Sequence, residues 1–151
     1  MNRRYAAAAV SILLVAPLAP GSAQTKPSPV TEIISTQKTM AGQPIDVPDG
    51  PVQVIADRIV LPKGAVIGTH MHFWARYVYV QSGEVTVTIA DTNKSTKFTA
   101  GQMIVEPLGK WHSGLVTQDA VLISVEQVPP GRCNTIKPPA PGGQNDCKPA
   151  S

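Results

Sequence analysis

From Val52 onward, short apolar runs alternate with turn-forming residues about every ten positions. Glu84–Ala90 shows the pattern most clearly, because Val85, Val87 and Ile89 alternate with threonines and successive side chains of a strand point to opposite faces. The chain also carries 15 prolines and 12 glycines among its 151 residues, which favours turns over long helices. These features predict an all-β domain, either a sandwich or a barrel.

We expect a series of short strands in this part of the chain. They are Gln53–Leu61, Ala65–His72, Arg76–Gln81, Glu84–Ala90, Ser95–Phe98, Gln102–Glu106, Trp111–Thr117 and Val121–Gln127. Before them, Thr31–Thr36 is the only strand-like piece. We expect it to form either an edge strand or an arm that is swapped between the subunits of a dimer.

The first 23 residues have the features of a secretory signal peptide. Arg3 and Arg4 precede the apolar stretch Ala6–Leu18, and small residues lead to a cleavage site after Ala23. The apolar stretch is too short, and too broken by Pro17, to cross a bilayer, which takes about 20 residues. We therefore expect the mature protein to begin near Gln24, to be periplasmic or secreted and to carry no membrane anchor.

The net charge of the chain is small. Thirteen basic and ten acidic residues give +3, and removal of Arg3 and Arg4 leaves eleven basic residues against ten, or +1. Because no basic run remains, nucleic acid is excluded as an expected partner.

The composition changes abruptly after Val128, where six of the 15 prolines lie. We expect this tail to be irregular. It holds the only two cysteines, Cys133 and Cys147. In an exported protein an even cysteine count favours a disulfide, which would stabilise the fold by about 3 kcal/mol. The alternative is two free thiols, and a zinc site is less favoured because the tail has no histidine.

All three histidines fall within two segments, Gly64–Gly83 and Gly101–His112. In a strand, His70 and His72 would point to the same face. One more histidine on a neighbouring strand would complete a face of three nitrogens for a metal ion. The alternative, three unrelated surface or core histidines, fits this joint spacing less well.

With these residues set out, the segment from about Gln53 to Gly131 resembles a cupin. The matches to the first cupin motif are Gly64, His70, His72 and Gly83. The matches to the second motif are Gly101, Pro107, Gly109 and His112. The sequence departs from the motifs at Arg76, where a glutamate is expected, and at Val116, where asparagine is usual.

The resemblance implies a double-stranded antiparallel β-barrel, the cupin or jelly-roll fold, with irregular N- and C-terminal extensions and often a homodimer. We divide the chain into a signal peptide (1–23), an N-terminal arm (24–50), a cupin barrel (51–131) and a Pro-rich, disulfide-closed tail (132–151). The resemblance also implies a pocket in the mouth of the barrel, where His70, His72 and His112 hold one divalent transition metal, iron, manganese, nickel or zinc. Three-histidine cupins occur among the thiol dioxygenases, so the missing glutamate does not exclude iron.

Arg76 is the departure with chemical consequences, because a guanidinium repels a metal ion and cannot bind it. Its side chain turns away, grips an anionic substrate in the pocket, or forms a surface salt bridge. Glu106 is the nearest spare carboxylate in the second motif, and is a further candidate ligand if it points inward.

Several aromatic residues crowd the two motifs. Phe73, Trp74 and Trp111 would line the pocket for a small organic ligand, or else belong to the barrel core. Trp111, next to His112, is the favoured pocket wall.

Two classes of function remain open. One is a metal-dependent oxygenase or isomerase that acts on a small molecule, anionic if Arg76 binds it. The other is a non-enzymatic cupin that binds a ligand or senses or stores metal. No nucleophile is evident, because both cysteines lie in the tail and no histidine is left to act as a base.

Overall fold

The computed structural model describes residues 28–138 of the chain. The chain divides into two units, Met1–Val30 and Thr31–Ser151, and the account below concerns the second. The signal peptide and Cys147 lie outside the described residues, so signal cleavage and the disulfide remain predictions. The described part of the chain contains no helix long and apolar enough to span a membrane.

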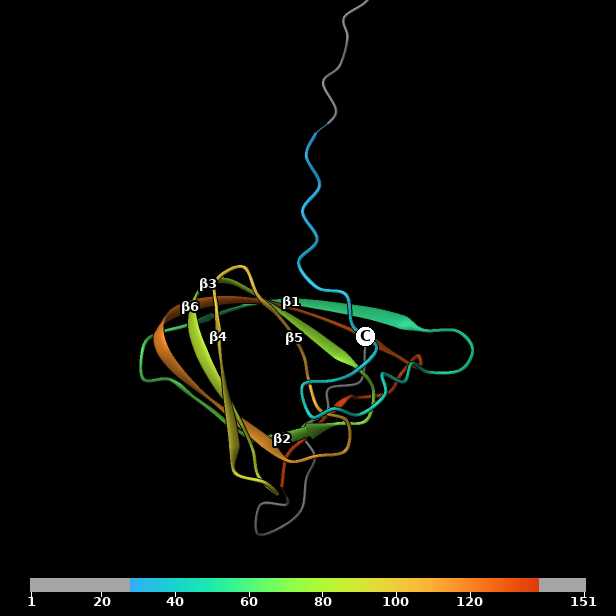
Figure 1. Cartoon of the computed structure of the whole chain (residues 1–151). Coiled ribbons are helices and arrows are strands. Elements are labelled where there is room, and N and C mark those ends of the chain that lie inside the picture. The colour runs from blue at the N-terminus through green and yellow to red at the C-terminus, as the bar shows by residue number, and fades with distance from the viewer. Residues whose placement is uncertain (1–27, 139–151) are drawn as a thin grey trace, which may run out of the picture. The chain divides into compact units, whose positions relative to one another are not determined.

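The described residues form an antiparallel β-barrel without helices, which confirms the predicted all-β fold (Figure 1). The strands are β1 (Gln53–Leu61), β2 (Val66–His72), β3 (Arg76–Ile89), β4 (Lys94–Thr99), β5 (Met103–Val105), β6 (His112–Val128) and β7 (Thr135–Ile136).

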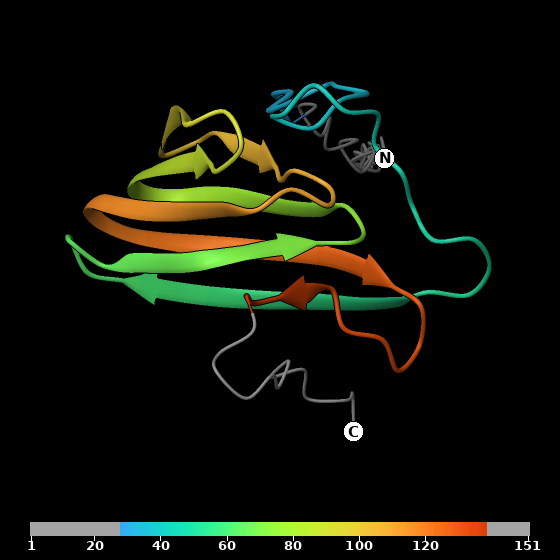
Figure 2. The same ribbon diagram turned by 90° about the horizontal axis from the view of Figure 1, so that it is seen from below.

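Strand β6 is the centre of the sheet. β3 pairs with one edge along its whole length, from Arg76 opposite Glu126 to Ile89 opposite His112. β1 and then β2 pair with the other edge. β5 and β4 extend β3, and β7 extends β2 at the opposite side of the sheet (Figure 2).

The long strands β3 and β6 bend together (Figure 2), and their pairing is irregular around Gly83. Gly83 has φ of 80°, a conformation that residues with a Cβ rarely adopt. A Cβ there would also lie 2.0 Å from the carbonyl oxygen of Asp119 on β6. Glycine is therefore required at this position both by the backbone conformation and by the close approach of β6.

In two places, two strands that we expected to be separate form one continuous strand. The pieces predicted on either side of Ser82 and Gly83 are joined in β3, and those on either side of Gln118–Ala120 are joined in β6. Irregular register between Val80 and Val85 takes up the bend without ending the pairing.

The prediction of an edge strand at Thr31–Thr36 is wrong, because these residues are exposed and form no strand. The swapped-arm alternative stays a prediction. The arm is fastened further on, where Met40 N–H donates to the carbonyl of Val105 at 2.8 Å.

The core consists mainly of valines, as the alternation predicted. Val85, Val87 and Ile89 are all at least 96% buried. Val85 and Val87 pack with Val78, Val80, Ile104, Val116, Ala120 and Leu122. The inward faces of β3 and β6 thus form the barrel interior, and the polar groups described next lie at one end of it.

Candidate metal centre

Four side chains converge in the barrel: His70, His72, Glu106 and His112. One nitrogen or oxygen atom from each lies within 4.8 Å of the others. His70 and His72 come from β2, His112 begins β6 opposite His70, and Glu106 directly follows β5. All four side chains are buried, His72 completely. The structure thus brings together the three predicted histidines and the further candidate carboxylate.

The backbone orients two of the three imidazole rings. His70 Nδ1–H donates to the Gly68 carbonyl at 2.8 Å, and His112 Nδ1–H donates to the Lys110 carbonyl at 2.9 Å. A carbonyl oxygen only accepts, so Nδ1 carries the proton in both rings and Nε2 keeps its lone pair. This is the tautomer that binds a metal through Nε2, with the other ring nitrogen held by a hydrogen bond.

The atoms that face one another in the cluster have no hydrogen-bond partners. His72 Nε2, His112 Nε2 and Glu106 Oε2 are buried, and none forms a hydrogen bond within the described residues. His72 Nε2 lies 2.8 Å from Glu106 Oε2. Buried polar atoms normally have partners, so this set of donor atoms fits a metal ion that would bind all of them.

The electrostatics favour the protonation states that a metal requires. Burial, followed by the nearby His112, lowers the pKa of His70 to about 4, and burial also lowers the pKa of His112. Burial alone would raise the pKa of Glu106, but the closeness of His72, Arg76 and His112 outweighs it and lowers this pKa to about 2. At neutral pH, His70 and His112 are therefore neutral and Glu106 is ionised, as metal ligands must be.

Arg76 points inward, with 15% of its side chain exposed. It donates hydrogen bonds to Thr135 Oγ1 at 3.1 Å and to Ser124 Oγ at 3.0 Å. Its Nε lies 3.8 Å from Glu106 and 3.9 Å from Glu126. Arg76 is therefore neither turned away nor part of an isolated surface salt bridge.

Glu106 places its carboxylate beside the position where the first motif lacks one. Its backbone N–H donates to the carbonyl of Arg76 at 2.9 Å, since β5 pairs with the start of β3. The cluster thus contains a carboxylate next to position 76, supplied from the adjacent chain segment.

Two cavities border the cluster. An interior cavity of about 70 Å³ is lined by Glu106 and apolar side chains of the core. A second cavity of about 210 Å³ is lined by Thr135 and Lys137 from the C-terminal segment. Ile67, His70 and Arg76 line both, so they separate the barrel interior from the second cavity, which we call the mouth cavity.

The aromatic residues predicted to line the pocket do not line either of these cavities. Phe73 is 54% exposed and packs edge-on against Trp74, with ring centroids 5.9 Å apart. Trp74 and Trp111 are half-buried. The space beside the cluster is therefore lined by aliphatic side chains, Arg76 and the C-terminal segment.

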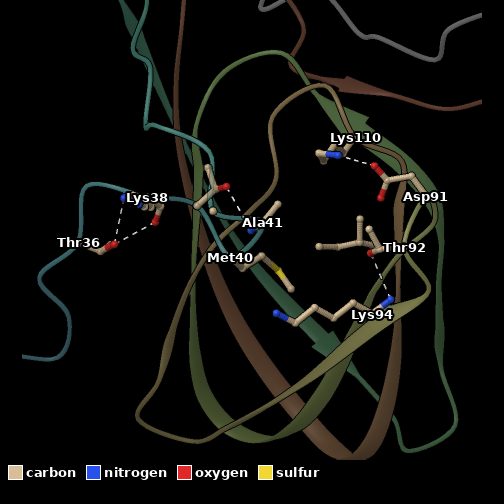
Figure 3. A pocket seen from close by; sticks show the side chains of 11 residues that line it. Thr36, Lys38, Met40, Ala41, Asp91, Thr92, Lys94 and Lys110 are labelled. Atoms are coloured by element: carbon tan, nitrogen blue, oxygen red, sulfur yellow. Dashed lines mark hydrogen bonds and ion pairs between the residues drawn. The ribbon is translucent and has the colours of Figure 1, made fainter.

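A separate pocket of about 360 Å³ lies between the N-terminal arm and the β3–β4 turn (Figure 3). Lys94, Lys110, Asp91 and Met40 line it, and Lys110 is paired with Asp91. It contains none of the four clustered residues.

Four residues around the cluster were not predicted: Ser124, Glu126, Asn134 and Thr135. The alternation in β6 could have shown the first two, because Leu122, Ser124 and Glu126 are all buried on one face. No comparable signal marks the other two, which lie in the segment expected to be irregular.

Comparison with known proteins identifies the class. Residues 57–126 match the family model of the cupin domain, and the barrel is all-β as the resemblance implied. This stretch of the chain is therefore a type-2-like cupin domain.

Solved structures similar to the chain include an RmlC-like cupin from Shewanella frigidimarina NCIMB 400, with 26% identity and a TM-score of 0.44. That match covers 49% of this chain and 65% of the other chain, just under two thirds. KdgF from a Halomonas species is 21% identical, with 49% and 67% covered and a TM-score of 0.43. The polyketide cyclase RemF from Streptomyces resistomycificus is 23% identical, with 55% and 60% covered and a TM-score of 0.45. No curated protein matches the sequence.

Proposed function

We propose that this cupin binds one divalent transition metal through His70, His72, His112 and Glu106. The observation that carries the proposal is the convergence of buried ligand atoms without hydrogen-bond partners, together with the Nδ1 hydrogen bonds of His70 and His112. Three imidazoles and one carboxylate suit iron, manganese, nickel or zinc. Bound there, the ion would supply Lewis-acid or redox chemistry.

We further propose that the protein is an enzyme of the oxygenase or isomerase type that acts on a small organic molecule. The interior cavity beside His70 and Glu106 supports this, because a site that only stored metal would need no space next to it. The cavity is lined mostly by apolar side chains, and Arg76 balances the charge of Glu106. A cupin that only binds a ligand or senses metal remains the alternative.

Export of the protein to the periplasm or beyond is also a proposal. It rests on the paired arginines, the apolar stretch and the small residues before Gln24. The intact mass of protein recovered from its own compartment should lack Met1–Ala23, and a mass that retains them would contradict the proposal.

Metal analysis tests the proposed site. Wild-type protein should hold one equivalent of metal. His72→Ala and His112→Ala should weaken metal binding by more than about 100-fold, since losing a ligand weakens binding more than losing the hydrogen-bond partner of a ligand. Glu106→Gln should also weaken binding, with Glu32→Gln in the exposed arm as the matched control. Circular dichroism should show that these variants fold. Wild-type protein that binds none of Fe²⁺, Mn²⁺, Co²⁺, Ni²⁺ and Zn²⁺ would defeat the proposal.

A further inference from the structure

Residues 134–137, which we call the C-terminal strap, lie beyond the stretch that matches the cupin family. They contain β7, which pairs with the end of β2 so that Thr135 lies opposite His72 and Ile136 opposite Met71 (Figure 2). The sequence predicted an irregular tail here. Instead, the strap forms part of the wall of the mouth cavity.

Asn134 fastens the strap to the barrel. Its side chain is buried, accepts from the backbone N–H of Trp74 at 2.8 Å and donates to the Trp74 carbonyl at 3.0 Å. The same amide nitrogen donates to Glu126 at 2.9 Å. Asn134 thus pairs with Trp74 as a neighbouring strand would, and this fixes the position of the next residue.

Thr135 contacts the candidate ligand His72. Its Oγ1 lies 3.3 Å from His72 Nδ1 and accepts from Arg76 at 3.1 Å. The other two histidines have backbone carbonyls, from Gly68 and Lys110, as their Nδ1 partners. His72 differs because its Nδ1 lies next to a side chain, that of Thr135 in the strap.

A hydroxyl group, unlike a carbonyl, can both accept and donate a hydrogen bond. Its oxygen accepts from Arg76 and from His72 Nδ1–H at the same time, because it has two lone pairs. It can also donate to His72 Nδ1, which places the ring proton on Nε2, the atom 2.8 Å from Glu106. Thr135 is therefore compatible with the His72 tautomer that faces Glu106 and with the one that binds a metal.

We propose that the strap supports the metal centre and that Thr135, which lies in it, is the positioning residue for His72. The hydroxyl holds the ring plane of His72 through Nδ1, so that Nε2 points at the other ligands. This inference rests on the proposed metal site. Loss of partners of this kind commonly weakens metal binding by about 10- to 100-fold.

The test compares Thr135→Val, which removes the hydroxyl at nearly constant volume, with Thr135→Ser, which retains it. Co²⁺ is titrated into metal-free protein in competition with a chelator. Thr135→Val should weaken Co²⁺ binding by about 10- to 100-fold, whereas Thr135→Ser should stay close to wild type. Thr86→Val makes the same change on β3, where the side chain forms no hydrogen bond within residues 28–138, and should also bind like wild type. If Thr135→Val does not fold, Thr135→Ala takes its place with the same expectation.

A second readout needs no metal. The ring ¹⁵N chemical shifts of His72 in the metal-free protein report the hydrogen bonding of its ring nitrogens, and they should change in Thr135→Val but not in Thr86→Val. If Thr135→Val binds Co²⁺ with the affinity of wild type and its His72 ring shifts are unchanged, the positioning role is overturned. The proposed metal site would then remain intact. A wild-type protein that binds no metal would instead defeat the proposed function.

Discussion

Arg76 stands at the motif position where a glutamate is expected, and Glu106 supplies a carboxylate from the neighbouring segment. Glu106 is aimed into the histidine cluster, and Arg76 lies behind it, surrounded by Glu106, Glu126 and, at 4.0 Å, Asp57. Three carboxylates thus face one guanidinium. Since they already surround Arg76, its main role in the metal-free protein is to balance them rather than to wait for an anionic ligand.

Replacing Arg76 should therefore destabilise the metal-free protein. Arg76→Met keeps much of the side-chain volume but leaves buried Glu106 and Glu126 without their cation, which should cost on the order of 3 kcal/mol. Added metal should recover part of this loss, because it supplies positive charge beside Glu106. Urea unfolding with and without Zn²⁺ measures both effects. Arg58→Met is the control, since Arg58 is exposed on β1; equal losses for the two variants would contradict the argument.

At the scale of the elements, the barrel depends on the bend shared by β3 and β6. Gly64 N–H donates to the Val116 carbonyl at 2.8 Å, and Val116 N–H donates to the Ala65 carbonyl at 2.9 Å. These bonds continue the pairing of β6 across the turn between β1 and β2. Three chain segments therefore bend together, and Gly83 lies at the closest approach between two of them.

Gly83→Ala should be much more destabilising than a glycine substitution in open space. At Gly101, where φ is 89° and nothing lies near the added Cβ, alanine should cost about 1 kcal/mol through backbone strain. At Gly83 the same strain is joined by the clash with Asp119, so the total should reach about 3 kcal/mol or more. Thermal and urea unfolding of both variants measure the difference, and similar midpoints would show that β6 moves away at little cost.

Glu84 joins three strands beside the bend and should make stability depend on pH. Hydrogen bonds from Thr117 on β6, at 2.5 Å, and from Lys97 on β4 lower the pKa of Glu84 from its usual value of 4.5. The unfolded chain thus binds a proton at a higher pH than the folded chain does. The stabilisation is present above pH 4.5 and is lost as the pH falls through the lowered pKa.

Glu84→Gln should remove this contribution. The variant should be less stable than wild type at pH 6, and the difference should shrink as the pH falls below 4.5. Urea unfolding across this range provides the measurement, with Glu32→Gln in the exposed arm as the control. A difference that stays constant with pH would show that the charge of Glu84 does not matter.

At the scale of the whole described unit, segments on both sides of the family match hold the loops of the site. Gln43 in the N-terminal arm donates to the Leu108 carbonyl at 2.6 Å and accepts from the Leu108 N–H at 3.0 Å. Asn134 makes the equivalent pair with Trp74. Leu108 lies between Glu106 and His112, and Trp74 follows His72, so each amide fastens a loop next to the candidate ligands.

A disulfide between Cys133 and Cys147 would tie the tail next to Asn134. If it forms, thiol labelling of freshly isolated protein without reductant should find no free cysteine, and reduction should expose two. Closing this loop would stabilise the fold by about 3 kcal/mol. Two labelled thiols before reduction would rule out the disulfide.

The sequence determined the features that depend on local backbone geometry. Period-two alternation predicted the buried face of Val85, Val87 and Ile89, and the two-residue spacing of His70 and His72 predicted that they share a face. The bounds of β1 also agree with the prediction, since Pro62 and Gly64 mark its end locally. These properties follow from strand geometry and turn chemistry, which act over a few residues.

Only the tertiary structure decided which side chains complete the site. The sequence predicted a turn at Ser82 and Gly83. Instead, β3 continues through these residues because β6 bends alongside and keeps the backbone paired. The inward direction of Glu106 depends on how β5 pairs with β3, and Thr135 reaches His72 across 63 residues of sequence. Such contacts arise from register and packing between distant segments, and for this reason the pattern of the tail alone could not reveal them.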